Sequence, residues 1–378
     1  MLKEQITDTA PSEAPRETFV LNLGPQHPAT HGVLRVKLTM DGEFVTRAEP
    51  ICGYIHRMQE KMGENRSYAQ FLPNTSRIDY LSAMMYTHAF VGVVERAAKL
   101  QVPPRAEYIR VITSELNRIS SHLVWWGAFL LDLGGFTPLL YAFDDREKIL
   151  DLLEAITGAR LTYAYFRIGG LYNDVDQAFI DGSRAFVSHM RPRLKMYREL
   201  VTDNIILRKR LIGIGPVSGE MCRKYGASGP VIRGSGIPYD VRKSEPYSAY
   251  PDFDFEIPCF TEGDSMARYL VRLEEIAQSL RIIEQALDRL PAGPVMAEKV
   301  PRVLKLPAGD YCYATEAARG RFMVRLVSDN KEIPYRVKLR TPCLSNLSLF
   351  EEASQGMLLP DALAFMGSLD LVIPDIDR

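Results

Sequence analysis

Two histidines lie four positions apart in the stretch LNLGPQHPATHGVLRV, residues 21–36. On a helix, the spacing of His27 and His31 would place two imidazoles on one face, where they could bind a metal ion. Pro28 lies between them and Gly32 follows them, and these residues prevent a regular helix. The residues therefore argue against a metal site. The ordinary alternative is a tight turn whose histidines hydrogen-bond nearby carbonyls.

A second candidate for chemistry is Tyr80, in the stretch PNTSRIDYLSAMMY, residues 73–86. Asp79 and Tyr80 fall where this loop passes into a helix, so the Tyr80 hydroxyl is expected at the end of an element. The structural alternative is that Asp79 caps the helix and that Tyr80 is a half-buried aromatic residue with a satisfied hydroxyl.

Three ionisable residues share one helical face, namely Glu115, Arg118 and His122. A solvated ion pair is the usual explanation of such spacing. Asp132 follows in an apolar run, where a buried carboxylate would need a partner. Pairing of this acid with a histidine would be chemically useful.

The two-histidine loop opens a small predicted sheet. Apolar and polar residues alternate over Val33–Met40, Asp41-Gly42 follows as a turn, and Glu43–Ala48 supplies the return strand of a hairpin. The preceding residues are polar and include proline, which is typical of a tail. We therefore expect a tail over residues 1–18 and a hairpin segment over residues 19–60.

Long amphipathic helices are predicted for the middle of the chain. Pro103-Pro104 suits the first turn of a helix whose apolar residues recur at three- and four-residue steps as far as Gly134. Such segments indicate a helical core over residues 61–290. After it, short strand-like runs predict an α+β segment over residues 291–378. The expected fold class is α+β, with a central helix bundle and small mixed segments at both ends. The other predicted helices cover residues 79–100, 144–157, 175–208 and 264–290.

Bulk composition excludes several classes of protein. The formal net charge of −1 provides no field that would attract nucleic acid. The five cysteines form no Cys-x-x-Cys pair, which argues against a disulfide framework and a zinc site and favours a reducing compartment. The start has no secretory signal, and Gly134-Gly135 and Pro138 break the apolar stretch 119–143 into pieces too short to span a bilayer. The glycine-rich stretch 229–250 lacks the context of a dinucleotide fingerprint.

Several stretches occur in a consistent order from about Phe19 to Arg378. They are GPQHPATHGVLR, GYIHR, PRAEYIRVITSELNRISSHL, LLDLGGFTPLLYAFDDRE, FRIGG, RGSGIPYDVRK, DSMARYLVR and SLDLVIPDIDR. Together they resemble the 49-kDa/D subunit of respiratory complex I, NADH–quinone oxidoreductase. That family is related to the large subunit of nickel–iron hydrogenases, so the resemblance implies a fold of that type.

The relation to hydrogenases raises a rival function. The hydrogenase holds its metal with two Cys-x-x-Cys pairs, one near each end. In the first counterpart here, Cys52 remains and Ile55 takes the place of its partner, and the second counterpart, residues 370–375, has no cysteine. A thiolate cage cannot be built from one sulfur, so the hydrogenase function fails on the number of ligands.

The resemblance implies that this chain and a small iron–sulfur subunit, which holds the terminal 4Fe-4S cluster, jointly enclose the quinone head group. It places the head-group ligands on His31 and Tyr80 and the acid partner of the histidine on Asp132, and it leaves His27 structural. Reference pKa values near 10 for tyrosine and 6.5 for histidine allow both side chains to protonate a quinone as it is reduced.

The resemblance also implies a substrate, partner subunits and a cellular location. The substrate would be ubiquinone or menaquinone, with no cofactor bound covalently, and its reduction would be coupled to proton translocation. Further partners would be a 30-kDa/C-type hydrophilic subunit and a membrane-arm subunit beside the quinone channel. The location would be peripheral, on the cytoplasmic face of a prokaryotic inner membrane or the equivalent organellar side. Two alternatives stay open: a related complex that uses ferredoxin or a deazaflavin as donor, and a structural subunit without redox chemistry.

Three features depart from the pattern of the family. Met58 stands where relatives usually carry glycine, Ala318–Arg321 replaces Pro-Lys-Gly-Glu, and the segment between Pro294 and Tyr311 is shorter than in many relatives. The closing stretch, Leu369–Arg378, is apolar apart from its acids and its last arginine. We expect it to be buried, with partners for those acids.

Overall fold

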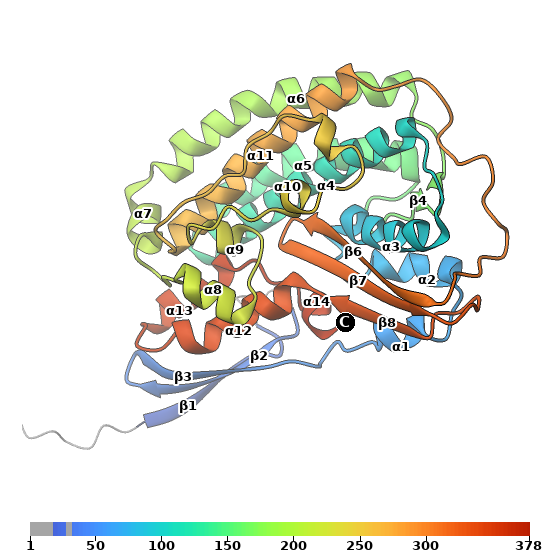
Figure 1. Ribbon diagram of the computed structural model, residues 1–378. Coiled ribbons are helices and arrows are strands. Elements are labelled where there is room, and N and C mark those ends of the chain that lie inside the picture. Colours follow the sequence, from blue (N-terminus) through green and yellow to red (C-terminus); the bar gives the residue numbers. More distant parts are fainter. Residues whose placement is uncertain (1–17, 28–31) are drawn as a thin grey trace, which may run out of the picture.

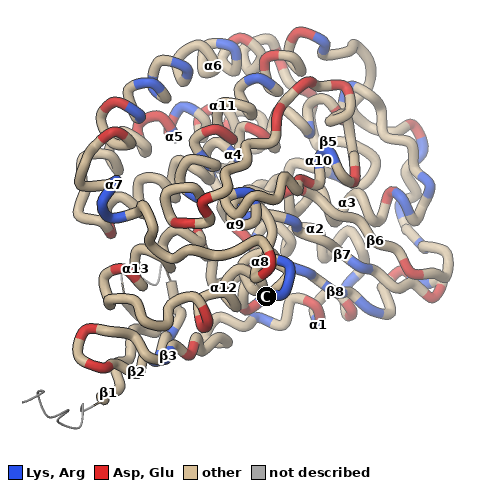
Figure 2. The backbone as a smooth tube through the Cα atoms, turned by 60° about the vertical axis from the view of Figure 1, so that its left-hand side comes forward, with Lys and Arg blue, Asp and Glu red and all other residues tan. Residues whose placement is uncertain are grey.

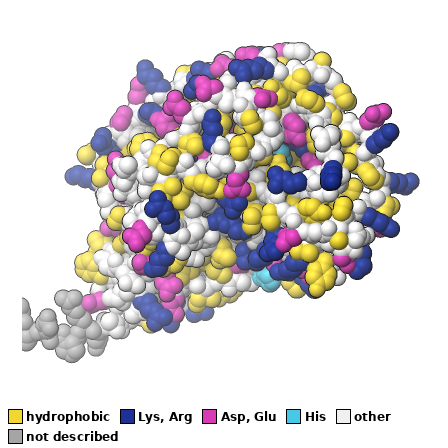
Figure 3. Space-filling view, in the orientation of Figure 1, with side chains coloured by type: hydrophobic (Ala, Val, Ile, Leu, Met, Phe, Trp, Pro, Cys, Tyr) yellow, Lys and Arg dark blue, Asp and Glu magenta, His cyan; other side chains and the backbone are white. Residues whose placement is uncertain are grey.

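The computed structural model describes residues 18–27 and 32–378. Long helices form one layer, a three-stranded sheet lies against it, and a second three-stranded sheet made by the N-terminal segment lies apart from the first (Figure 1). The C-terminus ends between the two sheets (Figure 1). The predicted α+β class with a helical centre is confirmed. Positive and negative side chains are interspersed over the face shown in Figure 3, as the near-zero net charge leads one to expect.

The N-terminal sheet is antiparallel, with the order β1-β2-β3, and its strands are β1 (Thr18–Leu23), β2 (Arg35–Asp41) and β3 (Phe44–Ile51). The predicted hairpin is β2 and β3, and β1 adds a third strand. In β2 every second residue is buried, so one face of the sheet contributes Val36, Leu38 and Met40 to a core. Gly24 has a φ of 79°, and a Cβ there would lie 2.1 Å from the Leu34 carbonyl oxygen. Only glycine therefore lets the chain turn out of β1 at this point.

The helical layer contains the predicted helices with shifted ends. Its main helices are α1 (Gln59–Gly63), α2 (Tyr68–Thr75), α3 (Ala83–Ala98), α4 (Pro104–Asp132), α5 (Phe136–Thr157), α6 (Gln177–Tyr197), α7 (Ile205–Leu211) and α11 (Ser265–Asp288). The helix predicted over residues 175–208 is wrong in one respect, because a π-helical turn, Arg198–Thr202, and a cap at Asn204 divide it. No helix in the described part of the chain combines the length and apolar character needed to cross a membrane.

Shorter elements connect this layer to the end of the chain. They are the hairpin β4 (Phe166–Arg167) and β5 (Gly170–Leu171), α8 (Gly219–Tyr225), α9 (Pro230–Arg233), α10 (Val241–Ser244) and the 3-10 turn Tyr250–Asp252. The C-terminal sheet has the order β6-β7-β8, and its strands are β6 (Gly309–Ala317), β7 (Gly320–Ser328) and β8 (Arg336–Arg340). Three helices close the chain, namely α12 (Pro342–Ala353), α13 (Leu359–Ser368) and α14 (Ile373–Asp377).

The two ends of the chain share one core. The apolar face of the N-terminal sheet packs against α12 and α13, and Figures 1 and 2 both place these elements side by side. The edge of β3 is also paired with the segment before α13, since Val45 N donates to Met357 O at 2.8 Å and Leu359 N donates to Glu43 O at 3.0 Å. The predicted hairpin is therefore held by residues from the opposite end of the sequence.

The structure explains one departure from the family pattern. Met58 precedes α1 with φ 53° and ψ 41°, which is the left-handed region. This conformation costs a residue with a side chain about 1–2 kcal/mol, whereas glycine adopts it without steric cost. Glycine, the residue expected here from the family resemblance, would therefore be the unstrained choice, and Met58 carries a backbone cost.

Met58→Gly is expected to raise the free energy of unfolding by about 0.5–1 kcal/mol, because the relief of strain exceeds the entropy that glycine adds to the unfolded chain. Urea denaturation followed by circular dichroism measures the change. Met58→Ala is the matched control, since alanine meets the same backbone cost and should leave stability nearly unaltered. A glycine variant less stable than the alanine variant would contradict the explanation.

Candidate functional site

The C-terminal segment is the centre on which the candidate residues converge. Leu369, Leu371, Val372, Ile373 and Ile376 are all buried. Their burial confirms the expectation that the closing stretch lies inside the protein rather than forming a frayed tail.

The acids of this segment have the partners that burial demands. Asp375 accepts hydrogen bonds from the Tyr86 hydroxyl at 2.5 Å and from the Cys343 amide at 3.0 Å. Asp377 accepts from the amides of Gly53 at 2.8 Å and Ile55 at 2.9 Å. The end of the chain thereby fixes the loop that follows β3. Burial, together with the nearby Asp79, raises the pKa of Asp375 to about 7.

A buried ion-pair cluster lies directly beside Tyr80. Arg319 donates through Nη1 to Asp79 Oδ2 at 3.0 Å and through Nη2 to Asp370 Oδ1 at 2.9 Å. The same Nη1 also reaches the hydroxyls of Ser82 and Ser121. One guanidinium therefore joins the turn before α3, helix α4 and the C-terminal segment. The sequence marks Arg319 only as part of a departure from the family motif, and nothing in that motif predicted this role.

Tyr80 is partly buried in the turn that joins α2 to α3, and the helix predicted to begin at Asp79 begins instead at Ala83. Burial raises the pKa of its phenol, and the positive charge of Arg319 opposes part of that rise. A phenol with a raised pKa keeps its proton at neutral pH, so Tyr80 is a hydrogen-bond donor there. Asp79 does not begin the helix; its Oδ1 accepts from the amides of Leu81 and Ser82 in the turn that precedes α3.

His31 lies outside the described residues, whereas both ends of its loop are described. His27 and Gly32 form an antiparallel bridge. A Cβ on Gly32 would come within 2.8 Å of Cγ1 of Ile373, so the backbone at Gly32 packs closely on α14. The residue that follows His31 is therefore anchored on the same C-terminal segment that holds Arg319 near Tyr80.

Asp132 is the last residue of α4, and its side chain is exposed in this chain. The expectation of a buried carboxylate is wrong, because the apolar run ends in the final turn of the helix, where the surface begins. The carboxylate nevertheless lies near the C-terminal segment, since a Cβ on Gly367 would be 3.9 Å from Asp132 Oδ2. Trp125, two turns earlier, donates to the Gly367 carbonyl at 2.8 Å and fixes this approach.

The face of Glu115, Arg118 and His122 is fully buried, so the solvated ion pair is the wrong explanation. Arg242 approaches Glu115 at 3.2 Å, and Glu275 lies 2.9 Å from His122 Nε2. Burial alone would raise the pKa of Glu115, but the two arginines lower it to about 2. These buried charged contacts join α4, α10 and α11.

Comparisons with known proteins agree with this architecture. The family model described as "Respiratory-chain NADH dehydrogenase, 49 Kd subunit" matches residues 132–305 and 298–378. The D 2 subunit of NADH-quinone oxidoreductase from Opitutus terrae is 74% identical over 98% of this chain and 92% of its own length. The D subunit of the same enzyme from Desulfotalea psychrophila is 68% identical over 96% of this chain and 98% of its own, and that of Geobacillus thermodenitrificans is 47% identical over 96% and 99%.

These similarities define the class of the protein as a subunit of an oxidoreductase complex. Within that class, the chain belongs to the family of the 49-kDa subunit of respiratory-chain NADH dehydrogenase. The resemblance carried by the sequence motifs is confirmed.

Proposed function

We propose that the chain forms one side of the quinone head-group site of a proton-translocating NADH:quinone oxidoreductase. Its relatives bear the name of that enzyme, and in this chain Tyr80 and Gly32, the residue that follows His31, lie against one C-terminal segment. The observation that carries the proposal is the position of Tyr80, a protonated phenol beside a buried arginine whose charge is balanced by two carboxylates.

Reduction of the quinone to quinol requires two electrons and two protons, one proton for each carbonyl oxygen. The electrons would come from the 4Fe-4S cluster of the small iron–sulfur partner, because this chain offers no ligand set for a cluster in its described part. Tyr80 would donate a hydrogen bond and then a proton to one oxygen, and His31 would serve the other. Asp132, at the exposed end of α4, would pair with His31. When His31 gives up a proton, the change in charge of this pair would be felt at the surface of the chain.

The same proposal covers the surroundings of the site. A 30-kDa/C-type hydrophilic subunit and a membrane-arm subunit would complete the complex, with this chain peripheral on the cytoplasmic face of the membrane. The exposed position of Asp132 supports only one part of that arrangement, namely a neighbouring subunit that covers the end of α4.

Tyr80→Phe is expected to lower electron transfer to a quinone analogue about a hundredfold, because it removes a general acid without changing the shape of the ring. The rate is measured in assembled membranes, together with reduction of an artificial acceptor that bypasses the quinone site. Tyr335→Phe, on an exposed tyrosine just before β8, is the matched control and should keep both rates.

His31→Ala should lower the quinone rate in the same way, again with intact assembly and with the artificial acceptor unaffected. Wild-type quinone rates in both the Tyr80 and the His31 variants would overturn the assignment of the site.

A further inference from the structure

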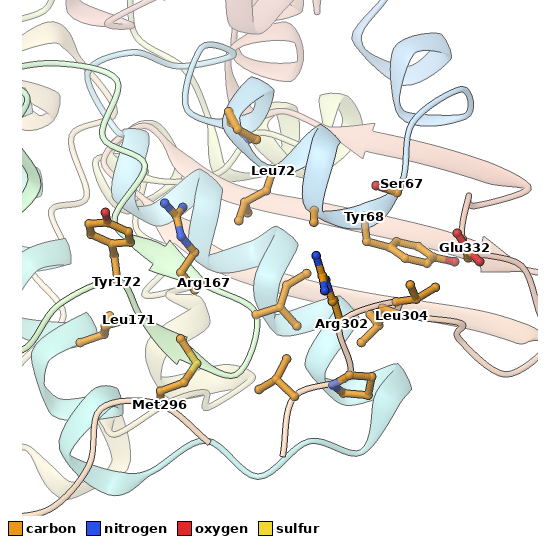
Figure 4. Close-up of a pocket in the computed structure, with 16 residues that line it drawn as sticks. Ser67, Tyr68, Leu72, Arg167, Leu171, Tyr172, Met296, Arg302, Leu304 and Glu332 are labelled. Carbon is orange, nitrogen blue, oxygen red and sulfur yellow. The ribbon is translucent and has the colours of Figure 1, made fainter. Parts of the chain in front are cut away.

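A cavity of about 760 Å³ lies away from Tyr80, between α2, the β4–β5 hairpin and the segment 296–304 (Figure 4). Its floor is apolar and includes Leu72, Leu171, Met296 and Leu304. A volume of this size with an apolar lining falls in the range of ligand pockets. None of the residues assigned to the quinone site contributes to it, so the cavity needs an explanation of its own.

Two cations without a carboxylate partner lie along this apolar floor. Arg167 and Arg302 line the cavity, and neither lies within ion-pair distance of a carboxylate among the described residues. The Arg167 guanidinium stacks over the Tyr172 ring at 4.9 Å, which keeps it at the groove. Glu332, at the other end, is 3.9 Å from Lys305. Figure 4 shows Arg167 and Arg302 at separate points along the groove, with Tyr172 beyond the first.

Two large side chains at the rim of the cavity are exposed to solvent, as expected of residues that a partner covers in a complex. Tyr172 is 62% exposed and Val303 is 54% exposed. The segment that carries Val303 is tied down before it, where Ala297 N donates to Gly169 O at 2.8 Å, and after it, where Ser328 Oγ donates to Leu306 O at 2.9 Å. Between these anchors the chain forms a strap with no helix or strand.

We propose that this groove receives an amphipathic segment of a neighbouring subunit, whose apolar side chains cover Tyr172 and Val303 and whose carboxylates pair with Arg167 and Arg302. Two cations spaced along an apolar floor match carboxylates spaced along a peptide. A lipid would offer one charged head at the end of an acyl chain, and it would leave one of the two arginines unpaired.

A photo-crosslinking amino acid at Val303 of the assembled complex tests the proposal directly. The expected product joins this chain to a peptide of another subunit that contains aspartate or glutamate next to apolar residues. The same probe at Lys195, an exposed position on α6, is the control and should yield little product. Recovery of a lipid adduct, or of no protein adduct, at Val303 would overturn the proposal.

The double variant Arg167→Glu with Arg302→Glu tests the charges. The double variant should bind the crosslinked subunit about tenfold more weakly, which corresponds to a loss of about 1.4 kcal/mol in binding free energy. Lys148→Glu with Lys195→Glu is the matched reversal on α5 and α6 and should retain the subunit. Quinone turnover per assembled complex should be unaltered in both, so the outcome is independent of the proposed quinone site. Equal retention by the two double variants would refute the role of the arginines.

Discussion

Replacing Arg319 with leucine is expected to lower the free energy of unfolding by about 3–5 kcal/mol. The variant leaves the buried Asp79 without its counter-ion, and it leaves the nearly buried Asp370 with only Arg272, at 3.8 Å. Desolvation of an uncompensated charge is the dominant cost in such a case, more than the loss of any one hydrogen bond. Chemical denaturation of the purified chain, followed by circular dichroism, measures the difference.

Two controls separate this effect from a general loss of packing. Arg319→Lys restores the residue that the family pattern carries and keeps the charge, so it should cost much less than the leucine variant. Arg325→Leu breaks the surface pair with Asp310, whose side chains are 53% and 46% exposed, and should cost under about 1 kcal/mol. A leucine variant at position 319 as stable as the Arg325 variant would show that the cluster does not hold the site together.

Deletion of Leu369–Arg378 is expected to abolish both folding of the N-terminal sheet and assembly of the complex. The five apolar side chains it removes are buried, and at about 1.5–3 kcal/mol each they contribute roughly 7–15 kcal/mol. That range equals the whole stability of a typical domain. Native gels and soluble yield measure the effect. Deletion of residues 1–16, a polar stretch, is the matched truncation and should be much milder; equal tolerance of both deletions would contradict the central role of the closing segment.

The fold was predictable wherever local signals decide the structure. Helix α4 begins at Pro104 because a proline suits its first turn, and it ends at Asp132 just before Gly134, as the sequence indicates. The break between α6 and α7 was missed although its signal was present: Asn204 caps α7 through a hydrogen bond to the amide of Ile206. The prediction treated residues 175–208 as one amphipathic helix and did not weigh that cap.

The site was less predictable because its contacts join distant parts of the sequence. Arg319 pairs with Asp79 across 240 positions and with Asp370 across 51, and no local spacing reveals such a pairing. Glu115 seemed to be a surface residue for the same reason, since Arg242 lies 127 positions away. Tyr80, by contrast, lies close to its predicted place, in the turn before α3, although residues 73–75 are the last turn of α2 rather than a loop and α3 begins at Ala83 rather than at Asp79. The assignments of His31, Tyr80 and Asp132 to the quinone remain predictions.

The shared core of the two chain ends has a consequence for biosynthesis. The amide of Gly53 donates to the carboxylate of Asp377, which is 324 positions later in the chain. At 5–20 residues per second, a ribosome needs on the order of tens of seconds to make that stretch. During this time the apolar face of the first sheet has nothing to pack against, and it is a surface that a chaperone can bind. A chain terminated before this segment therefore lacks the carboxylate of Asp377, which holds the loop after β3 in place.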